Sequence, residues 1–100
     1  MRASAELIMK SYKVVVTKSF SHEFKKSDRY TQQIILKFIK DNLENTDNPY
    51  KKGKRLKGEL SGFWRYRIMD YRLLVEIYDD QCIIKALRIG HRKQIYQRMR

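Results

Sequence analysis

The chain has 100 residues, of which 42% are hydrophobic, and its 23 Lys and Arg against 11 Asp and Glu give a formal net charge of +12. This length predicts one domain with one small core, and no apolar run approaches the roughly 20 residues that a membrane span needs. The single cysteine, Cys82, excludes a disulfide within the chain and is expected to be a small buried core residue. We expect no metal, no cofactor, no membrane contact and a cytoplasmic location, and the charge favours a polyanion or an acidic protein as partner.

The first residues, 1–10, join no periodic pattern and are expected to form a flexible extension, with a single domain over residues 11–100. Residues 12–17 are short and rich in β-branched side chains, which predicts a strand. Ser19 is then expected to cap a first helix that begins near Phe20.

A second, longer helix is predicted to begin at a cap on Ser27 or Asp28 and to run to about residue 43. Its apolar residues follow helical spacing and form one stripe: Tyr30, Ile34, Ile35, Phe38, Ile39 and Leu43. The two helices therefore predict a helical hairpin whose apolar side packs on a sheet.

A polar loop over residues 41–49 leads into five basic residues before the next acid, Glu59: Lys51, Lys52, Lys54, Arg55 and Lys57. This basic segment is either a solvated loop or a patch that follows phosphates.

A β-hairpin is predicted over residues 64–78, because large apolar residues alternate with arginine from Trp64 to Ile68. Alternation places Arg65 and Arg67 on one face. A two-residue turn at Met69 and Asp70 would set Arg67 directly opposite Arg72. Like charges across a strand pair are destabilising, so these arginines either stay in water or bind an anion.

The last predicted strand covers residues 81–89, after a turn at Asp79 and Asp80, and is apolar on both sides, which favours a central place in the sheet. Gly90 is expected to end it, and residues 92–98 form a short basic tail that is expected to be helical. The order β-α-α-β-β-β predicts an α+β fold, with a mostly antiparallel sheet and a helical hairpin on one face.

The other face of this sheet is expected to be free and to collect six polar residues: Arg65, Arg67, Arg72, His91, Arg92 and Tyr96. Arginine forks match phosphate geometry and remain charged, and the 2′-hydroxyl of RNA is an internal nucleophile. Histidine titrates near neutrality, and a tyrosine can stack on a base or orient a proton transfer. The set fits metal-independent RNA cleavage, and a merely solvated polar face is the alternative.

Two stretches, residues 54–77 and 87–96, resemble the RelE branch of the RelE/ParE toxin superfamily. The resemblance covers about residues 12–96 and rests on the joint spacing of four motifs: Leu56-Lys57-Gly58, Trp64-Arg65-Tyr66-Arg67, Asp70-Tyr71-Arg72 and Gly90-His91-Arg92.

This resemblance implies a microbial-ribonuclease-like fold and the toxin of a type II toxin–antitoxin system. RelE-like toxins enter the ribosomal A site and cut mRNA there, leaving a 2′,3′-cyclic phosphate. Their functional positions match Arg65, Arg67, Arg72, Arg92 and Tyr96, and the basic segment lies where such toxins contact ribosomal RNA.

The chain departs from the family pattern where the best-studied member has lysines in place of Arg65 and Arg67. Arginine cannot lose its proton as a tuned lysine can, so these two are expected to clamp phosphate, and the general base is His91 or Tyr96. The implied partners are an acidic, partly helical antitoxin, the ribosome and mRNA, with operator DNA reached only through the antitoxin. Two alternatives remain, a ParE-like inhibitor of DNA gyrase without enzymatic activity and an RNA-binding module that does not cleave.

Overall fold

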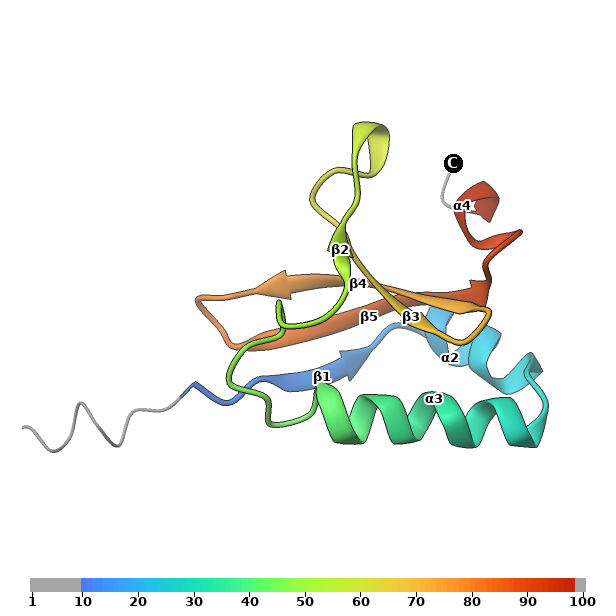
Figure 1. Ribbon diagram of the computed structural model, residues 1–100, viewed down its shortest axis with the longest axis horizontal. Coiled ribbons are helices and arrows are strands. Elements are labelled where there is room, and N and C mark those ends of the chain that lie inside the picture. The colour runs from blue at the N-terminus through green and yellow to red at the C-terminus, as the bar shows by residue number, and fades with distance from the viewer. Residues whose placement is uncertain (1–9, 99–100) are drawn as a thin grey trace, which may run out of the picture.

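The computed structural model describes residues 10–98 and contains one five-stranded sheet in the order β1-β5-β4-β3-β2 (Figure 1). The elements in chain order are β1 (Lys13–Val16), α2 (Lys18–Lys26), α3 (Arg29–Asn42), β2 (Lys54–Arg55), a 3₁₀ turn η1 (Gly58–Leu60), β3 (Trp64–Ile68), β4 (Tyr71–Tyr78), β5 (Ile83–His91) and α4 (Ile95–Arg98). The predicted α+β class is confirmed, and β2 and η1 are additions to the expected order. The expected extension over 1–10 lies, except for its last residue, outside the described residues.

The sheet is antiparallel except where β1 pairs with β5, so the predicted mostly antiparallel sheet is confirmed. β5 has β1 on one side and β4 on the other, which confirms its predicted interior position. Figure 1 shows α2 and α3 on one side of the sheet and α4 on the opposite side, together with the loop that carries η1.

The main core lies between the sheet and the two long helices, as the apolar stripe of α3 predicts. Tyr66 and Ile35 are fully buried, and the Tyr66 ring lies 5.8 Å from the Phe38 ring between centroids. Ile68 is also buried and Trp64 packs partly against this core, so the apolar face of the β3–β4 hairpin is the one that meets the helices.

The caps of the two long helices differ in how well the sequence identifies them. Asp28 caps α3 by accepting a 2.7 Å hydrogen bond from the Thr31 N–H, and hydrogen bonding by the Thr31 side chain and backbone lowers the pKa of the Asp28 carboxyl. The expected cap of α2, Ser19, is wrong. Thr17 is the cap: its hydroxyl accepts from the Phe20 N–H at 3.0 Å and donates to the Leu87 carbonyl at 2.8 Å.

The edge of β5 beyond the end of β1 is covered by side chains of α2. Glu23 accepts three hydrogen bonds from the Arg88 guanidinium and one from the Ile89 N–H. The Glu23 side chain is 9% exposed, so α2 satisfies strand groups that would otherwise be open to another chain.

Two expectations at the ends of β5 are corrected. Gly90 does not end the strand, because it pairs with Arg72 and the strand continues to His91. Cys82 is half-buried rather than a core residue, because the turn after β4 extends over residues 79–82 and the strand begins at Ile83 rather than at the predicted residue 81; Cys82 has a φ of 53°.

Candidate functional site

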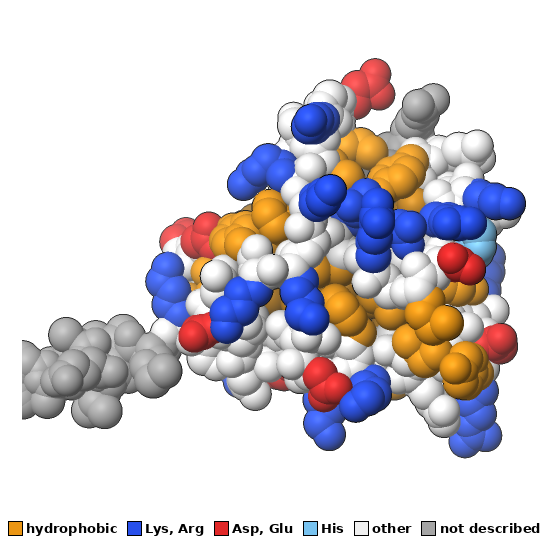
Figure 2. Space-filling view, viewed as in Figure 1, with side chains coloured by type: hydrophobic (Ala, Val, Ile, Leu, Met, Phe, Trp, Pro, Cys, Tyr) orange, Lys and Arg blue, Asp and Glu red, His pale blue; other side chains and the backbone are white. Residues whose placement is uncertain are grey.

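Basic side chains lie in register across one face of β2, β3 and β4. Lys54 stands opposite Arg65, and Arg67 stands opposite Arg72, as the two-residue turn predicts. This face, called the arginine face here, is turned away from α2 and α3. In Figure 2 Lys and Arg side chains form a band over this part of the molecule.

The positive charge on this face lies along β2, β3 and the part of β4 that pairs with β3. At the other end of β4, Glu76 stands opposite Lys85, and the Tyr78 hydroxyl donates to the Glu76 carboxylate at 2.9 Å. A sheet face that was merely solvated would gain from such opposite-charge pairs along its whole length. The uncompensated end is therefore the part of the face that suits an anion.

Arg72 lies at the centre of the charged end. Burial lowers the pKa of its guanidinium, and the like charges of Arg67, Arg65 and Arg92 lower it further, while Tyr96 acts in the opposite direction. Its Nη1 donates to the carbonyls of Met69 and Tyr71, both at 2.9 Å, which fixes the guanidinium beside the hairpin turn.

Arg92 reaches the same turn from the end of β5. Its backbone N–H donates to the Asp70 carbonyl at 2.7 Å, and its Nε lies 3.9 Å from the Asp70 carboxylate. Asp70 was expected only to form the turn, and the structure shows that it also ties Arg92 to the arginine face.

Tyr96 belongs to α4, which packs on the arginine side of the sheet. Ile95 of α4 and Leu74 of β4 are fully buried but lie outside the main core. Tyr96 lines a cleft of about 580 Å³ together with Lys57, Glu59 and Leu60 from the loop of η1. The loop and α4 are thus the two walls of a cleft beside the arginine face.

Two polar atoms at this site are buried without a partner. The Tyr96 hydroxyl and the Arg65 Nε have no hydrogen-bond partner among the described residues. Such atoms are unfavourable unless something else satisfies them, so they suit a polar ligand in the cleft.

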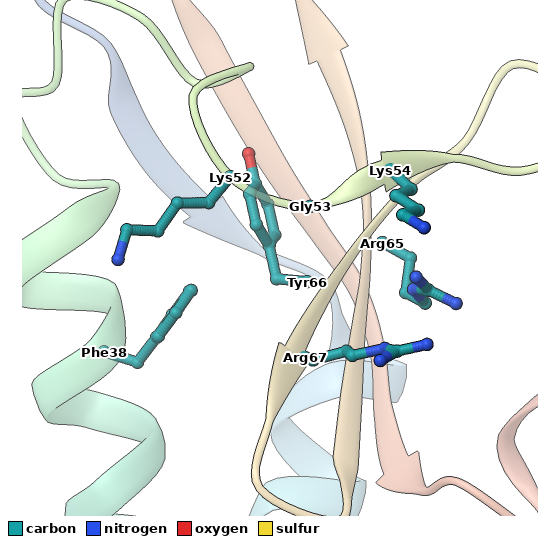
Figure 3. A pocket seen from close by; sticks show the side chains of 7 residues that line it. All are labelled: Phe38, Lys52, Gly53, Lys54, Arg65, Tyr66 and Arg67. Carbon is teal, nitrogen blue, oxygen red and sulfur yellow. The ribbon is translucent and has the colours of Figure 1, made fainter.

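The basic segment meets the arginine face at Gly53, in a pocket of about 250 Å³ lined by Phe38, Lys52, Gly53, Lys54, Arg65, Tyr66 and Arg67 (Figure 3). In Figure 3 Lys54, Arg65 and Arg67 extend to the same side, whereas Lys52 extends towards α3. Gly53 has a φ of +85°, and a Cβ there would lie 2.4 Å from the Arg65 carbonyl oxygen. Only glycine allows the segment to approach β3 this closely.

The other basic residues of the segment do not line the pocket at Gly53. The Arg55 guanidinium sits 5.6 Å from the centre of the Trp64 ring, and Lys51 pairs with Asp47 at 3.5 Å. Lys57 lines the larger cleft with Tyr96.

Among the six residues predicted for the free face of the sheet, His91 is the one that lies on the other face. It stands opposite Tyr71, with ring centroids 6.0 Å apart, and lines a separate pocket with residues of α2. Because β5 continues through Gly90, strand alternation turns His91 to the helix side of the sheet. Its Nδ1 accepts from the Lys93 N–H at 3.3 Å.

Sequence reasoning missed two residues that shape the site, Gly53 and Asp70. A glycine inside a basic run is the only signal for the first, and the place of Asp70 in the turn is the only signal for the second. Within residues 10–98 no helix is long and apolar enough to cross a membrane, and no three metal-binding side chains gather.

Comparison with known proteins gives a family and a shared fold. The family model described as the ParE toxin of the type II toxin–antitoxin system parDE matches residues 14–96. Toxin RelG of Mycobacterium tuberculosis is 42% identical over 50 residues, which make up 50% of this chain and 58% of RelG. The match thus spans little more than half the length of that relative.

Among solved structures, the toxin–antitoxin complex RelBE2 from Mycobacterium tuberculosis contains a chain with a TM-score of 0.74 and 28% identity, covering 81% of this chain and 98% of that one. The archaeal RelE–RelB complex from Pyrococcus horikoshii gives a TM-score of 0.63 at 23% identity, with coverages of 82% and 96%. The intact Escherichia coli RelBE complex gives 0.66 at 16% identity, with coverages of 81% and 96%. The latter two likenesses show the fold alone.

Proposed function

This chain belongs to the ParE toxin family of type II toxin–antitoxin systems, and we propose that it is a ribosome-dependent mRNA endonuclease of the RelE kind. The observation that carries the proposal is the set of arginines at one end of an otherwise charge-balanced sheet face. Arg65, Arg67, Arg72 and Arg92 lie beside a cleft that also holds the unpartnered hydroxyl of Tyr96.

The chemistry uses the RNA's own nucleophile. The 2′-oxygen bonds to the scissile phosphorus, the bond to the 5′-oxygen of the next nucleotide breaks, and a 2′,3′-cyclic phosphate remains. A base removes the 2′-proton, and an acid supplies a proton to the departing 5′-oxygen. The protein therefore has to position the phosphate, stabilise its added negative charge and move two protons.

The arginines divide between positioning and stabilisation. Arg65 and Arg67 would hold the phosphate on β3, while Arg72 and Arg92, both fixed at the β3–β4 turn, would stabilise the charge of the transition state. Bidentate guanidinium contacts suit both tasks.

Proton transfer is assigned to Tyr96 rather than His91. Within residues 10–98 the Tyr96 hydroxyl is buried in the cleft without a partner, whereas His91 faces the helices. Tyr96 would orient the 2′-hydroxyl or exchange its proton, and its ring can stack on a base.

The basic segment would provide ribosomal contacts that carry no sequence information. Lys51, Lys52, Lys54, Arg55 and Lys57 are all exposed. Lysine and arginine at such positions bind phosphates with a strong dependence on salt concentration.

The cognate antitoxin is proposed as the protein partner, because all three solved structures described above are complexes of a toxin with its antitoxin. An acidic, partly helical antitoxin segment would lie across the basic surface, and operator DNA would be bound only through the antitoxin. A partner that binds the folded state raises stability, so the melting temperature should rise when the cognate antitoxin is added.

The test of the catalytic assignment is growth arrest after expression, with mRNA cut inside reading frames. The double variant Arg72→Ala with Arg92→Ala should be non-toxic although it folds. Toxicity equal to that of the parent would show that these arginines do not carry the activity.

One alternative function is favoured by the description of the matched family, which is named after ParE. A ParE-like toxin would inhibit DNA gyrase without any chemistry and would not need the arginine and tyrosine set. Loss of supercoiling activity with intact mRNA would support it. RNA binding by purified protein and ribosomes with no cyclic-phosphate product would instead identify a non-cleaving RNA-binding module.

A further inference from the structure

The carboxylate of Asp79, at the β4–β5 turn, joins two tyrosines that are distant in sequence. It accepts a 2.7 Å hydrogen bond from the Tyr12 hydroxyl and a 2.8 Å hydrogen bond from the Tyr50 hydroxyl. Tyr12 is 2% exposed and belongs to the core beside β1. Tyr50 immediately precedes the basic segment, so Asp79 links the core to that segment.

Tyr50, directly before the basic segment, also contacts β3. Its ring packs edge-on against Trp64, with centroids 5.0 Å apart, and the Trp64 Nε1 donates to the Lys52 carbonyl at 2.8 Å. One residue before Tyr50, the Pro49 carbonyl accepts from the Tyr66 hydroxyl at 2.6 Å. The segment is thus held to the sheet from both sides of Tyr50.

The charge of Asp79 suits this task. Hydrogen bonds from Tyr12 and Tyr50 hold the pKa of its carboxyl below the ordinary value, and Lys10 and Arg55 act in the same direction against burial. Asp79 is therefore ionised at neutral pH and accepts both bonds as a charged group, which makes each stronger than a bond between neutral partners.

We propose that Tyr50 and Asp79, the latter at the end of β4 away from the β3–β4 turn, are positioning residues that hold residues 51–54 in place for RNA. The inference rests on the proposed RNA-directed function. A segment that is fixed before binding avoids the entropy cost of ordering its residues when the phosphates arrive. Its lysines would then contribute to affinity, and Lys54 would stay in register with Arg65.

The experiment compares Tyr50→Phe and Asp79→Asn with the parent chain, and Asp80→Asn is the matched control. Asp80 is an exposed neighbour, and its substitution changes the net charge as Asp79→Asn does. Trp64 is the only tryptophan of the chain, so its emission and anisotropy report directly on the contact with Tyr50. Affinity is measured with a short fluorescein-labelled single-stranded RNA, and cleavage with ribosomes and mRNA gives KM and kcat separately.

The expected result for Tyr50→Phe is a shifted and more mobile Trp64 signal and an RNA affinity lower by about tenfold, the order that a hydrogen bond to a charged group contributes. KM should rise by a similar factor with kcat unchanged, since the arginine face is intact. Asp79→Asn should show the same changes, and Asp80→Asn should match the parent in all of them.

The proposal would be overturned by an unchanged Trp64 signal in Tyr50→Phe, or by a changed signal with unaltered RNA affinity. A lowered kcat with unaltered KM would also contradict it. The RNA-binding measurement does not need catalysis, so a parent protein that binds RNA but cuts no mRNA would refute the proposed function and leave the positioning role intact.

Discussion

Replacing Arg67 with glutamine should stabilise the fold and impair the toxin. Arg67 stands directly opposite Arg72 and is the strongest like charge acting on it. Its exposed side chain has no hydrogen-bond or ion-pair partner among the described residues. Glutamine keeps much of the length of the side chain and removes only the uncompensated charge.

The expected rise in the free energy of unfolding follows from the cross-strand distance between the two arginines. Directly opposite Cβ atoms lie about 5 Å apart, and two guanidinium groups that splay into solvent lie at about 7 Å. At that distance and an effective dielectric constant of about 60, two unit charges repel by about 0.8 kcal/mol. The free energy of unfolding should therefore rise by about 0.5–1 kcal/mol, which corresponds to about 2–8 °C in melting temperature for a domain of this size.

The assay is thermal and urea unfolding at low and high salt, alongside ribosome-dependent cleavage. Screening reduces the Debye length from about 10 Å at 0.1 M salt to about 3 Å at 1 M, so the gain should nearly disappear at high salt. Cleavage should fall by about a hundredfold if Arg67 holds the phosphate.

Arg88→Gln is the matched control, because it removes an arginine that is paired. The Arg88 Nη2 lies 2.7 Å from the Glu23 carboxylate, and the two side chains are 23% and 9% exposed. Its loss should destabilise the fold by about 2–3 kcal/mol, somewhat less than for a fully buried pair. If Arg67→Gln lowered stability at low salt, or raised it equally at 1 M salt, repulsion on the arginine face would be refuted.

Three further predictions concern the framework around the site. Thr17→Ala should cost about 1–2 kcal/mol in unfolding free energy as the true cap of α2, whereas Ser19→Ala should have little effect in the same urea titration. Gly53→Ala should destabilise by more than about 2 kcal/mol, because its Cβ meets the β3 backbone at a left-handed φ; Gly58→Ala, with φ +66° but open space around it, should lose only about 1 kcal/mol. The lowered pKa of Asp79 gives stability that is present above the unfolded-state value near 3.9 and is lost as pH falls through the folded value. The difference between the parent and Asp79→Asn should therefore shrink at acid pH, and a difference independent of pH would contradict this linkage.

The sequence predicts the arginine pairing well because a hairpin leaves little freedom. A two-residue turn fixes the register, and period-two alternation then fixes the faces, so Arg67 and Arg72 had to be opposite. The class of fold and the packing of α3 on the hairpin follow from equally local patterns.

Features that depend on contacts between distant segments could not be predicted in the same way. A glycine inside a strand resembles a glycine that ends one, so His91 was assigned to the wrong face. Thr17 and Ser19 are both good caps, and only the Leu87 carbonyl across the sheet favours Thr17. The position of β2 depends on how closely Gly53 can approach β3, which no periodicity reveals.

The most direct test of the proposed function combines purified protein with ribosomes carrying a defined mRNA. The proposed function predicts a cut within the codon in the A site, with a 2′,3′-cyclic phosphate end, and no cut with the double variant Arg72→Ala and Arg92→Ala. Intact mRNA with the parent protein, or the same cut with the double variant, would contradict RNA cleavage on the arginine face.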